Sequence, residues 1–99
     1  MIVRIVHMFF EEDKTAEFLS IFEEVAPQIR NFEGCTHLEL WENKDVPGGF
    51  TTYSHWEGEE FLEKYRYSKL FEKTWGDTKK LFKQSPKAYS FEKTKFTLS

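Results

Sequence analysis

Histidine is the residue type in this chain best suited to proton transfer near neutral pH, and the sequence contains three of them. His7 lies in the segment Ile2–Phe10, which we expect to form a central strand and which is apolar except for this histidine and for Arg4, a charge that needs a partner. A buried imidazole there could abstract a proton from a phenolic or enolic ligand, because its pKa lies near the working pH. The alternative is a core histidine with one hydrogen bond to a tyrosine or to the backbone. His7 is therefore a candidate catalytic base, with that structural role as the competing interpretation.

The other two histidines, His37 and His55, are expected on neighbouring strands. Together with Glu39 they could share a metal ion, because imidazoles and carboxylates are common metal ligands. The spacing supplies no third strong ligand, and His7 should lie several residues away along its own strand. We therefore expect no metal and assign His37 and His55, with Tyr53, to a ligand pocket.

The segment 50–75, FTTYSHWEGEEFLEKYRYSKLFEKTW, is expected to position the remaining candidates. Its first part alternates in polarity as a strand does, and this strand should end at Trp56. Gly58 and Ser68 are good helix N-caps, which predicts a short helix, a break near residues 66–68 and a second helix that continues to Leu81 and Phe82. The strand and the two helices should bring four side chains to the wall of one cavity: Tyr53, His55, Tyr65 and Trp75.

A first helix should come before this segment. Asp13 is its expected N-cap, and apolar residues recur at helical spacing from Phe18 to Phe32. Pro27 lies inside the pattern and predicts a kink or an early loosening. Gly34 is the natural left-handed residue to end the helix.

Two further strands complete the pattern. Residues 35–41 alternate, the turn 43–49 follows, and a hairpin centred on Val46 pairs three residue couples: His37 with His55, Glu39 with Tyr53, and Trp41 with Thr51. Ser85 and Pro86 should end the helical pattern, so that residues 88–96 form the last strand. The order strand, helix, strand, strand, broken helix, strand predicts an α+β fold, the ferredoxin-like βαββαβ arrangement with a four-stranded antiparallel sheet in the order 4-1-3-2.

Composition excludes several classes of protein. The 99 residues suit a single domain that spans positions 1–99. A net charge of −3 argues against nucleic-acid binding, and without an apolar run of spanning length we expect no membrane partner. The N-terminus does not resemble a signal peptide, so a cytoplasmic location is expected. Cys35 is alone and cannot form an internal disulfide or a thiolate metal cluster.

The aromatic content predicts a partner. Eleven Phe, four Tyr and three Trp make up 18% of the chain, more than one small core should easily bury. The first strand is apolar on both faces, although helices can cover only one of them. We therefore expect a second copy of the chain, or a ligand, to cover part of this surface, with a homodimer as the simpler solution.

Three stretches resemble the antibiotic biosynthesis monooxygenase (ABM) domain family of the dimeric α+β barrel superfamily. They are MIVRIVHMFF at the N-terminus, PQIRNFEGCTHLELWEN from the first helix into the second strand, and FTTYSHWEGEEFLEKYRYSKLF. The resemblance spans nearly the whole chain. It implies a homodimer whose two sheets form a barrel, with a ligand pocket in each subunit between sheet and helices.

The same resemblance narrows the expected chemistry. Family members include cofactor-independent monooxygenases of anthrones or quinols and haem-degrading monooxygenases, and many others have no known activity. The haem-degrading branch uses an Asn, a Trp and an iron-binding His at positions that align here with His7, Tyr65 and Trp75. An indole at the iron-ligand position cannot replace the imidazole, which argues against haem degradation by that mechanism.

The resulting expectation is a cofactor-independent monooxygenase of a small aromatic or quinol-like metabolite. In such a reaction the substrate carbanion reduces oxygen itself, and the protein needs a base, hydrogen bonds to the developing oxyanion and a dry pocket. We assign these catalytic roles to His7, Tyr65 and Trp75, and we expect no cofactor because no Gly-rich phosphate loop is present. The competing interpretation is a non-catalytic homodimer that binds or senses a small aromatic ligand.

Overall fold

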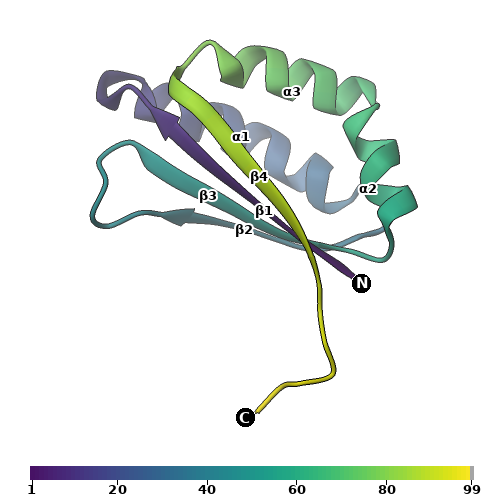
Figure 1. Ribbon diagram of the computed structural model, residues 1–99. Helices are drawn as coiled ribbons and strands as arrows, with labels where there is room; N and C mark the ends of the chain where they lie inside the picture. Colours follow the sequence, from purple (N-terminus) through teal and green to yellow (C-terminus); the bar gives the residue numbers. More distant parts are fainter. Residues whose placement is uncertain (99) are drawn as a thin grey trace.

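The computed structural model describes residues 1–98 as one antiparallel four-stranded sheet with helices packed against it (Figure 1). The elements are β1 (Ile2–Phe10), a 3₁₀ turn (Glu12–Lys14), α1 (Thr15–Arg30), β2 (Cys35–Glu42), β3 (Gly49–Trp56), α2 (Glu59–Arg66), α3 (Lys69–Lys79) and β4 (Phe82–Glu92). The strand order is β2-β3-β1-β4, which is the predicted order counted from the other edge. The α+β ferredoxin-like arrangement is therefore confirmed.

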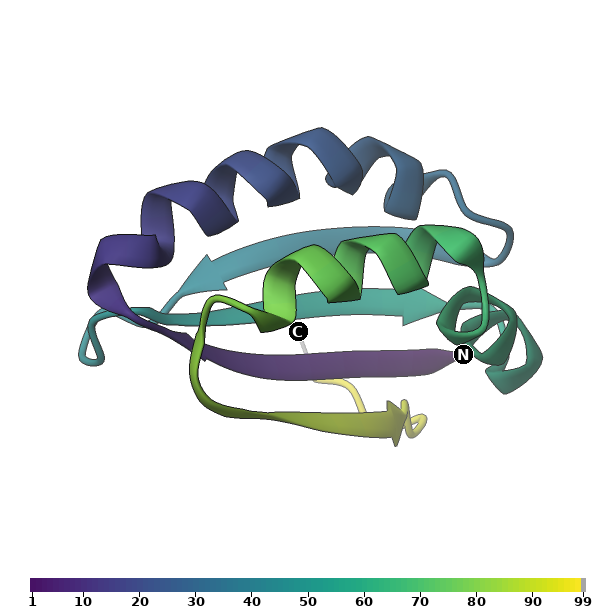
Figure 2. The ribbon, with the colours of Figure 1, turned by 90° about the horizontal axis from the view of Figure 1, so that it is seen from above.

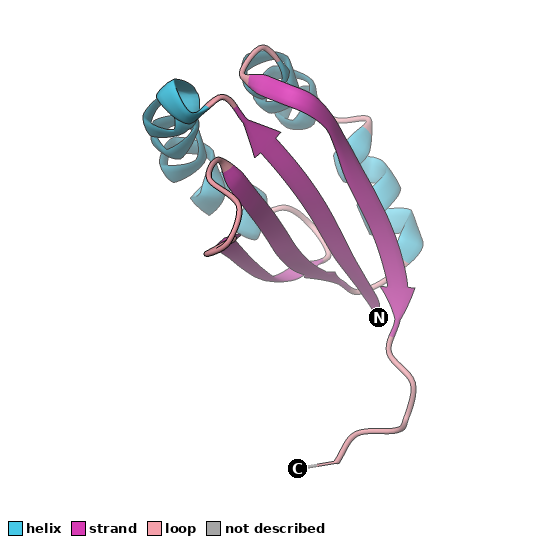
Figure 3. Cartoon of the chain, turned by 60° about the vertical axis from the view of Figure 1, so that its left-hand side comes forward, coloured by secondary structure: helices cyan, strands magenta, loops and turns pink. Residues whose placement is uncertain are grey.

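The helices all lie on one face of the sheet, and the opposite face carries no element of the described chain (Figures 1 and 2). We call this second surface the open face. Residues after β4 run away from the body of the protein beyond the end of the sheet (Figure 3). Within residues 1–98, no helix combines the length and apolar composition needed to cross a membrane.

β1 occupies the centre of the sheet, between β3 and β4. Its even-numbered side chains point to the helices, where Met8 and Phe10 are 5% and 1% exposed. The ring of Phe10 stacks on Phe18 of α1 at 4.1 Å and on Phe82 at 5.2 Å. This aromatic contact fixes the central strand against α1 and against the start of β4.

The hairpin of β2 and β3 has the predicted register. His37 pairs with His55, Glu39 with Tyr53 and Trp41 with Thr51. The turn returns the chain at the expected place because Gly48 adopts a φ of +79°, a conformation in which a side chain would also collide with the carbonyl of Phe10.

α1 differs from the expectation at both ends. Asp13 is not its N-cap, because Asp13 lies in the 3₁₀ turn and α1 begins at Thr15. The hydroxyl of Thr15 instead donates to the Glu12 carbonyl at 2.9 Å and closes the turn. Pro27 does not end the helix early, since α1 continues to Arg30 and Gly34 then takes the predicted left-handed conformation with φ +85°.

The break between the second and third helices is found where it was predicted. Gly58 is the N-cap of α2, and Ser68 is the N-cap of α3. The Ser68 hydroxyl accepts a hydrogen bond from the backbone N–H of Phe71 at 3.1 Å. Tyr67 alone separates the last residue of α2 from this cap.

The last strand begins earlier than predicted. α3 ends at Lys79, and β4 begins at Phe82 rather than at residue 88. Leu81 and Phe82, expected on the helix, therefore pack into the core from outside it. Pro86 is tolerated because β4 is an edge strand and its pairing with β1 shifts between Gln84 and Lys87.

Candidate functional site

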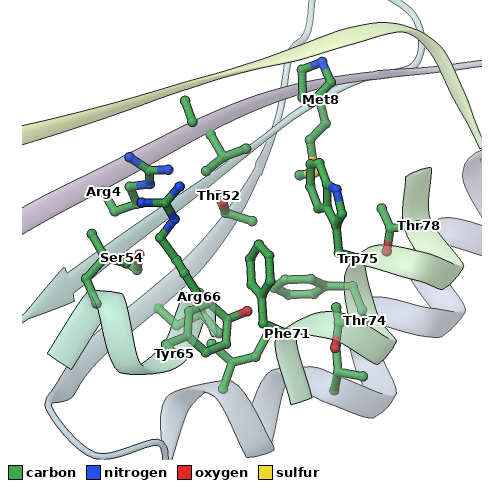
Figure 4. Close-up of a pocket in the computed structure, with 18 of the residues that line it drawn as sticks. Arg4, Met8, Thr52, Ser54, Tyr65, Arg66, Phe71, Thr74, Trp75 and Thr78 are labelled. Carbon is green, nitrogen blue, oxygen red and sulfur yellow. The ribbon is translucent and has the colours of Figure 1, made fainter. Parts of the chain in front are cut away.

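A cavity of about 400 Å³ lies between the sheet and the helices (Figure 4). This volume falls within the range of small-ligand sites, roughly 300 to 1,000 Å³. The helix-facing side chains of β1 and β3, including Met8 and Thr52, form one side of it. Phe18 and other apolar residues of α1 form a second side, and α2 and α3 close it with Tyr65 and Trp75.

Four aromatic rings in contact with one another line the cavity, and we call them the aromatic wall: Trp56, Tyr65, Phe71 and Trp75. Trp56 and Tyr65 stack at 5.1 Å with an interplanar angle of 25°. Phe71 meets Tyr65 edge-on at 5.1 Å and lies nearly parallel to Trp75 at 5.8 Å. A planar ligand would find aromatic side chains along this wall, against which it could pack by stacking or edge-on.

Tyr65 brings a polar group to the otherwise apolar wall. Its hydroxyl points from α2 into the cavity (Figure 4). Burial raises the pKa of the Tyr65 phenol far above its ordinary value, so this hydroxyl stays protonated. It can therefore donate a hydrogen bond to an oxygen of a bound ligand.

Two arginines give the cavity a positively charged end. Arg4 comes from β1 and Arg66 is the last residue of α2, and both line the cavity. Arg4 Nη1 donates to Ser90 Oγ at 2.9 Å, and Arg66 Nη1 donates to Glu63 Oε1 at 2.8 Å. Burial and the nearby Arg66 charge lower the pKa of Arg4.

One hydroxyl in the cavity wall is left without a partner. Among the residues that the structure describes, Thr74 Oγ1 is the buried side-chain oxygen or nitrogen that forms no hydrogen bond. Thr74 belongs to α3, one residue before Trp75, and lines the same cavity. Buried polar groups are usually paired, so this hydroxyl marks a place where a ligand could supply a partner after a side-chain rotation.

The predicted site residues fall on two faces of the sheet. Tyr65 and Trp75 line the cavity as expected, whereas His7, His37, Tyr53 and His55 are not part of its lining. The prediction that Tyr53 and His55 share a cavity wall with Tyr65 and Trp75 is therefore wrong. The reason is the two-residue period of a strand, which turns the odd-numbered side chains of β1 and β3 to the open face.

His7 lies on the open face between β3 and β4. Its Nδ1 is 2.8 Å from Thr51 Oγ1, and its ring meets Tyr89 edge-on with 6.1 Å between centroids. The sheet backbone separates this imidazole from the cavity. His7 therefore has the hydrogen bond expected of a structural histidine, and its role as a base stays a prediction that would need a substrate on the open face.

The remaining open-face candidates form two hydrogen-bonded sets, one on β2 and one on β3. Glu39 accepts from the His37 ring and, at 2.9 Å, from Trp41 Nε1, and both bonds lower the pKa of the Glu39 carboxyl. His55 Nε2 is 2.7 Å from the Tyr53 hydroxyl. Trp41 and Tyr53 stack at 4.8 Å. The hydrogen bonds lie within each strand and the ring contacts join β2 to β3, so these groups form a paired surface rather than the wall of the cavity.

No metal centre is apparent in the described chain. Within residues 1–98, no three side chains of His, Cys, Asp or Glu are grouped so that they could hold a metal ion together. The pair His37 and Glu39 has His55 beside it across the hairpin, with ring centroids of the two histidines 5.1 Å apart. That arrangement supplies hydrogen bonds within the protein.

The two arginines and Thr74 were not among the predicted site residues. Arg4 carried a signal, because a charge at a helix-facing position of an apolar strand needs a partner inside the fold. Arg66 and Thr74 carried none, since a cation at the end of a short helix and a threonine within another are ordinary surface residues until the packing is known.

Comparisons with known proteins agree on the fold. An antibiotic biosynthesis monooxygenase structure superposes with a TM-score of 0.89 at 16% identity over 95% of this chain and 99% of that one. A conserved protein from Methanosarcina mazei gives 0.88 at 17% identity, covering 95% and 94%. A conserved protein of unknown function from Bacteroides thetaiotaomicron gives 0.80 at 19% identity, covering 91% and 95%. At these identities the likeness establishes the fold.

The family follows from the sequence itself. No curated protein matches the chain as a sequence relative. Residues 1–75, from β1 to the middle of α3, match the family described as antibiotic biosynthesis monooxygenase. This stretch includes Arg4, Tyr65, Arg66 and Trp75 of the cavity lining. The chain therefore belongs to the antibiotic biosynthesis monooxygenase family.

Proposed function

We propose that this protein is a cofactor-independent monooxygenase of a small aromatic or quinol-like metabolite, which binds in the cavity between the sheet and the helices. The observation that carries the proposal is the cavity itself. It combines ligand-sized volume, the aromatic wall and one neutral phenol, Tyr65, directed inward. An apolar site with few polar groups suits a planar aromatic ligand.

In the proposed reaction the ionised substrate gives one electron to O₂, and the two radicals combine into a peroxide at the substrate carbon. For a methylene carbon, loss of water then leaves a ketone, so that CH₂ and O₂ yield C=O and H₂O. Tyr65 donates its O–H to the substrate oxygen on which negative charge develops. Phe71 and Trp75 hold the ring and keep water away from the radical pair.

The substrate must supply its own acidity in this scheme. The ionisable residues that line the cavity within the described chain are two arginines and two tyrosines: Arg4, Tyr65, Arg66 and Tyr67. The lining therefore includes no imidazole or carboxylate to act as a base. Anthrones and hydroquinones ionise readily, and nearby guanidinium charges favour the anion further. These substrates need no strong base from the protein.

We also propose that the active form is a homodimer in the cytoplasm. Proteins of this family are typically dimers. The open face exposes large side chains, with Trp41 at 43%, Tyr89 at 47% and Phe91 at 51%. A second copy of the chain would bury these side chains against its own open face.

A second candidate is a non-catalytic dimer that binds or senses an aromatic ligand in the same cavity. The absence of an imidazole and a carboxylate from the described lining favours this alternative, because no such side chain is there to accept a proton from a weakly acidic ligand. Both functions use the same cavity, so they differ only in whether the bound ligand is oxidised.

Oxygen uptake distinguishes the two functions. The protein is mixed with a panel of anthrones and hydroquinones without added metal or flavin, beside a boiled control. We expect uptake above the control with at least one compound, and Tyr65→Phe should lower kcat by about tenfold to a hundredfold because it removes one donor to the oxyanion. Binding of the same compounds without uptake above the boiled control would favour the non-catalytic dimer.

A further inference from the structure

The two arginines of the cavity lie at one end of the aromatic wall. Arg4 is in the first half of β1 and Arg66 ends α2, so they reach the same end from different elements. Figure 4 shows their guanidinium groups side by side, with Trp75 and Thr78 toward the other end of the cavity. The cavity is therefore polar and cationic at one end and apolar along its length.

The positive charge at this end is only partly balanced. Glu63 is the carboxylate bonded to Arg66, while Arg4 donates to the neutral hydroxyl of Ser90. Two guanidinium groups against one carboxylate leave one net positive charge. Each guanidinium has five N–H donors, so several remain for a ligand.

The Arg4 cation lies in an unfavourable environment. Burial and the charge of Arg66 lower the pKa of Arg4, which means that its cation is less favourable there than in water. An arginine keeps its proton in proteins, so it cannot relieve this cost by becoming neutral. An anion placed between the two groups would relieve both the repulsion and the lost hydration.

We infer that the cavity takes an aromatic acid, whose carboxylate binds between Arg4 and Arg66 and whose ring lies along the aromatic wall. The inference names the substrate class of the proposed monooxygenase site and rests on that proposal for the chemical outcome. A carboxylate fits better than a phenolate or enolate, because its two oxygens can each accept from a different guanidinium fork. The charged end then orients the ring toward Tyr65 and Trp75.

Ligand pairs that differ only in charge test this assignment. Naphthoate and naphthamide have the same bicyclic ring, and Trp56 and Trp75 in the wall provide a fluorescence signal for binding. We expect naphthoate to bind the unmodified protein about tenfold or more tighter than naphthamide at low salt. Arg4→Gln and Arg66→Gln should each remove most of this preference by weakening naphthoate binding much more than naphthamide binding.

The matched control removes a positive charge from the same helix but outside the cavity. Lys64 lies two residues before Arg66 on α2, pairs with Glu33 at 3.1 Å and is not part of the cavity lining. Lys64→Gln should leave the affinities for both probes unchanged. An equal loss of naphthoate binding in Lys64→Gln would assign the preference to the overall charge of α2 and overturn the inference.

Three other results would also overturn it. They are equal affinity for the two probes, equal weakening of both probes in the arginine variants, and failure of both probes to bind the unmodified protein. Binding of naphthol, measured at pH values below and above its pKa, tests the other class of anion, the phenolates. Binding of ionised naphthol without binding of naphthoate would replace the carboxylate with a phenolate.

Oxygen uptake separates this inference from the proposed function. Dihydroxynaphthalene is compared with the same compound carrying a ring carboxylate. If naphthoate is preferred, the preference depends on both arginines and neither compound causes oxygen uptake, the aromatic-acid site is supported and the monooxygenase function is refuted. If both compounds cause oxygen uptake at equal kcat/KM and naphthoate is not preferred over naphthamide, the monooxygenase function is supported and the aromatic-acid site is refuted.

Discussion

At the scale of single residues, the cavity presents hydrogen-bond donors rather than bases. Tyr65 is a neutral phenol, and Arg4 and Arg66 are permanent cations. Such a set stabilises negative charge on a ligand but cannot remove a proton from it. The chemistry it supports is therefore that of a ligand acidic enough to ionise in a cationic, largely apolar environment.

His7→Ala tests whether the open face takes part in turnover. We expect oxygen uptake per folded protein to persist, because the imidazole lies across the sheet from the cavity. Stability should fall by about 0.5 to 1.5 kcal/mol, the usual worth of one hydrogen bond, as measured by urea denaturation. Loss of turnover in a variant that stays folded and dimeric would instead make His7 the base and move the reaction to the open face.

Thr74→Val tests the unpaired hydroxyl. Valine has nearly the same shape, so the change removes a buried unsatisfied group and should raise stability by about 1 kcal/mol in thermal unfolding without ligand. Thr15→Val is the control, because the Thr15 hydroxyl is paired with the Glu12 carbonyl and its loss should destabilise. A lower melting temperature for Thr74→Val would mean that this hydroxyl has a partner in solution.

The sequence predicted part of the site for a physical reason. Tyr65 and Trp75 were found because their helical spacing places them on the buried side of α2 and α3. Tyr53 and His55 were misplaced, although alternation alone puts them opposite Phe50 and Trp56, which are 4% and 1% exposed. The larger apolar side chains of a strand are expected to face the helices. Applying that rule to Phe50 and Trp56 would have placed His55 on the other face of the sheet, away from the cavity.

At the scale of elements, the sequence predicted the helix starts that depend on neighbouring residues, but not the start of the last strand. The caps at Gly58 and Ser68 were predictable because they depend on neighbouring backbone groups. The start of β4 was not, since residues 80–87 contain both helical spacing and a proline. Packing in the core determines where β4 begins, because Phe82 stacks on Phe10 at 5.2 Å and a bulge in the edge strand accommodates Pro86.

Two glycine substitutions test how the helices are terminated and extended. Gly34→Ala should destabilise by more than about 1 kcal/mol, because φ is +85° and a Cβ would collide with Phe61 of α2. Gly76→Ala, the matched control inside α3, has no atom within 4 Å of the new Cβ and should stabilise by about 0.5 to 1 kcal/mol. Urea midpoints with unchanged slopes measure both. Equal effects of the two changes would show that backbone conformation at Gly34 does not limit stability.

At the scale of the whole molecule, the helices leave half of the sheet surface for another partner. The open face combines the paired network around Glu39 with exposed aromatic residues of β4. Beyond β4, Phe96 and Leu98 are 79% and 85% exposed. The aromatic residues exposed on the open face make that face suited to association.

The last prediction is that this association is a dimer made by the open face. Light scattering at micromolar concentration should give about twice the 11.9 kDa chain mass. Phe91→Lys should weaken the dimer by about tenfold to a hundredfold, because the dimer loses roughly 1.5 to 3 kcal/mol of aromatic burial in total from two half-exposed rings. Leu19→Lys, at an exposed apolar position on α1, should leave the mass unchanged. A monomer at every concentration would contradict the dimer, and a dimer broken by Leu19→Lys but not by Phe91→Lys would place the interface on the helices instead.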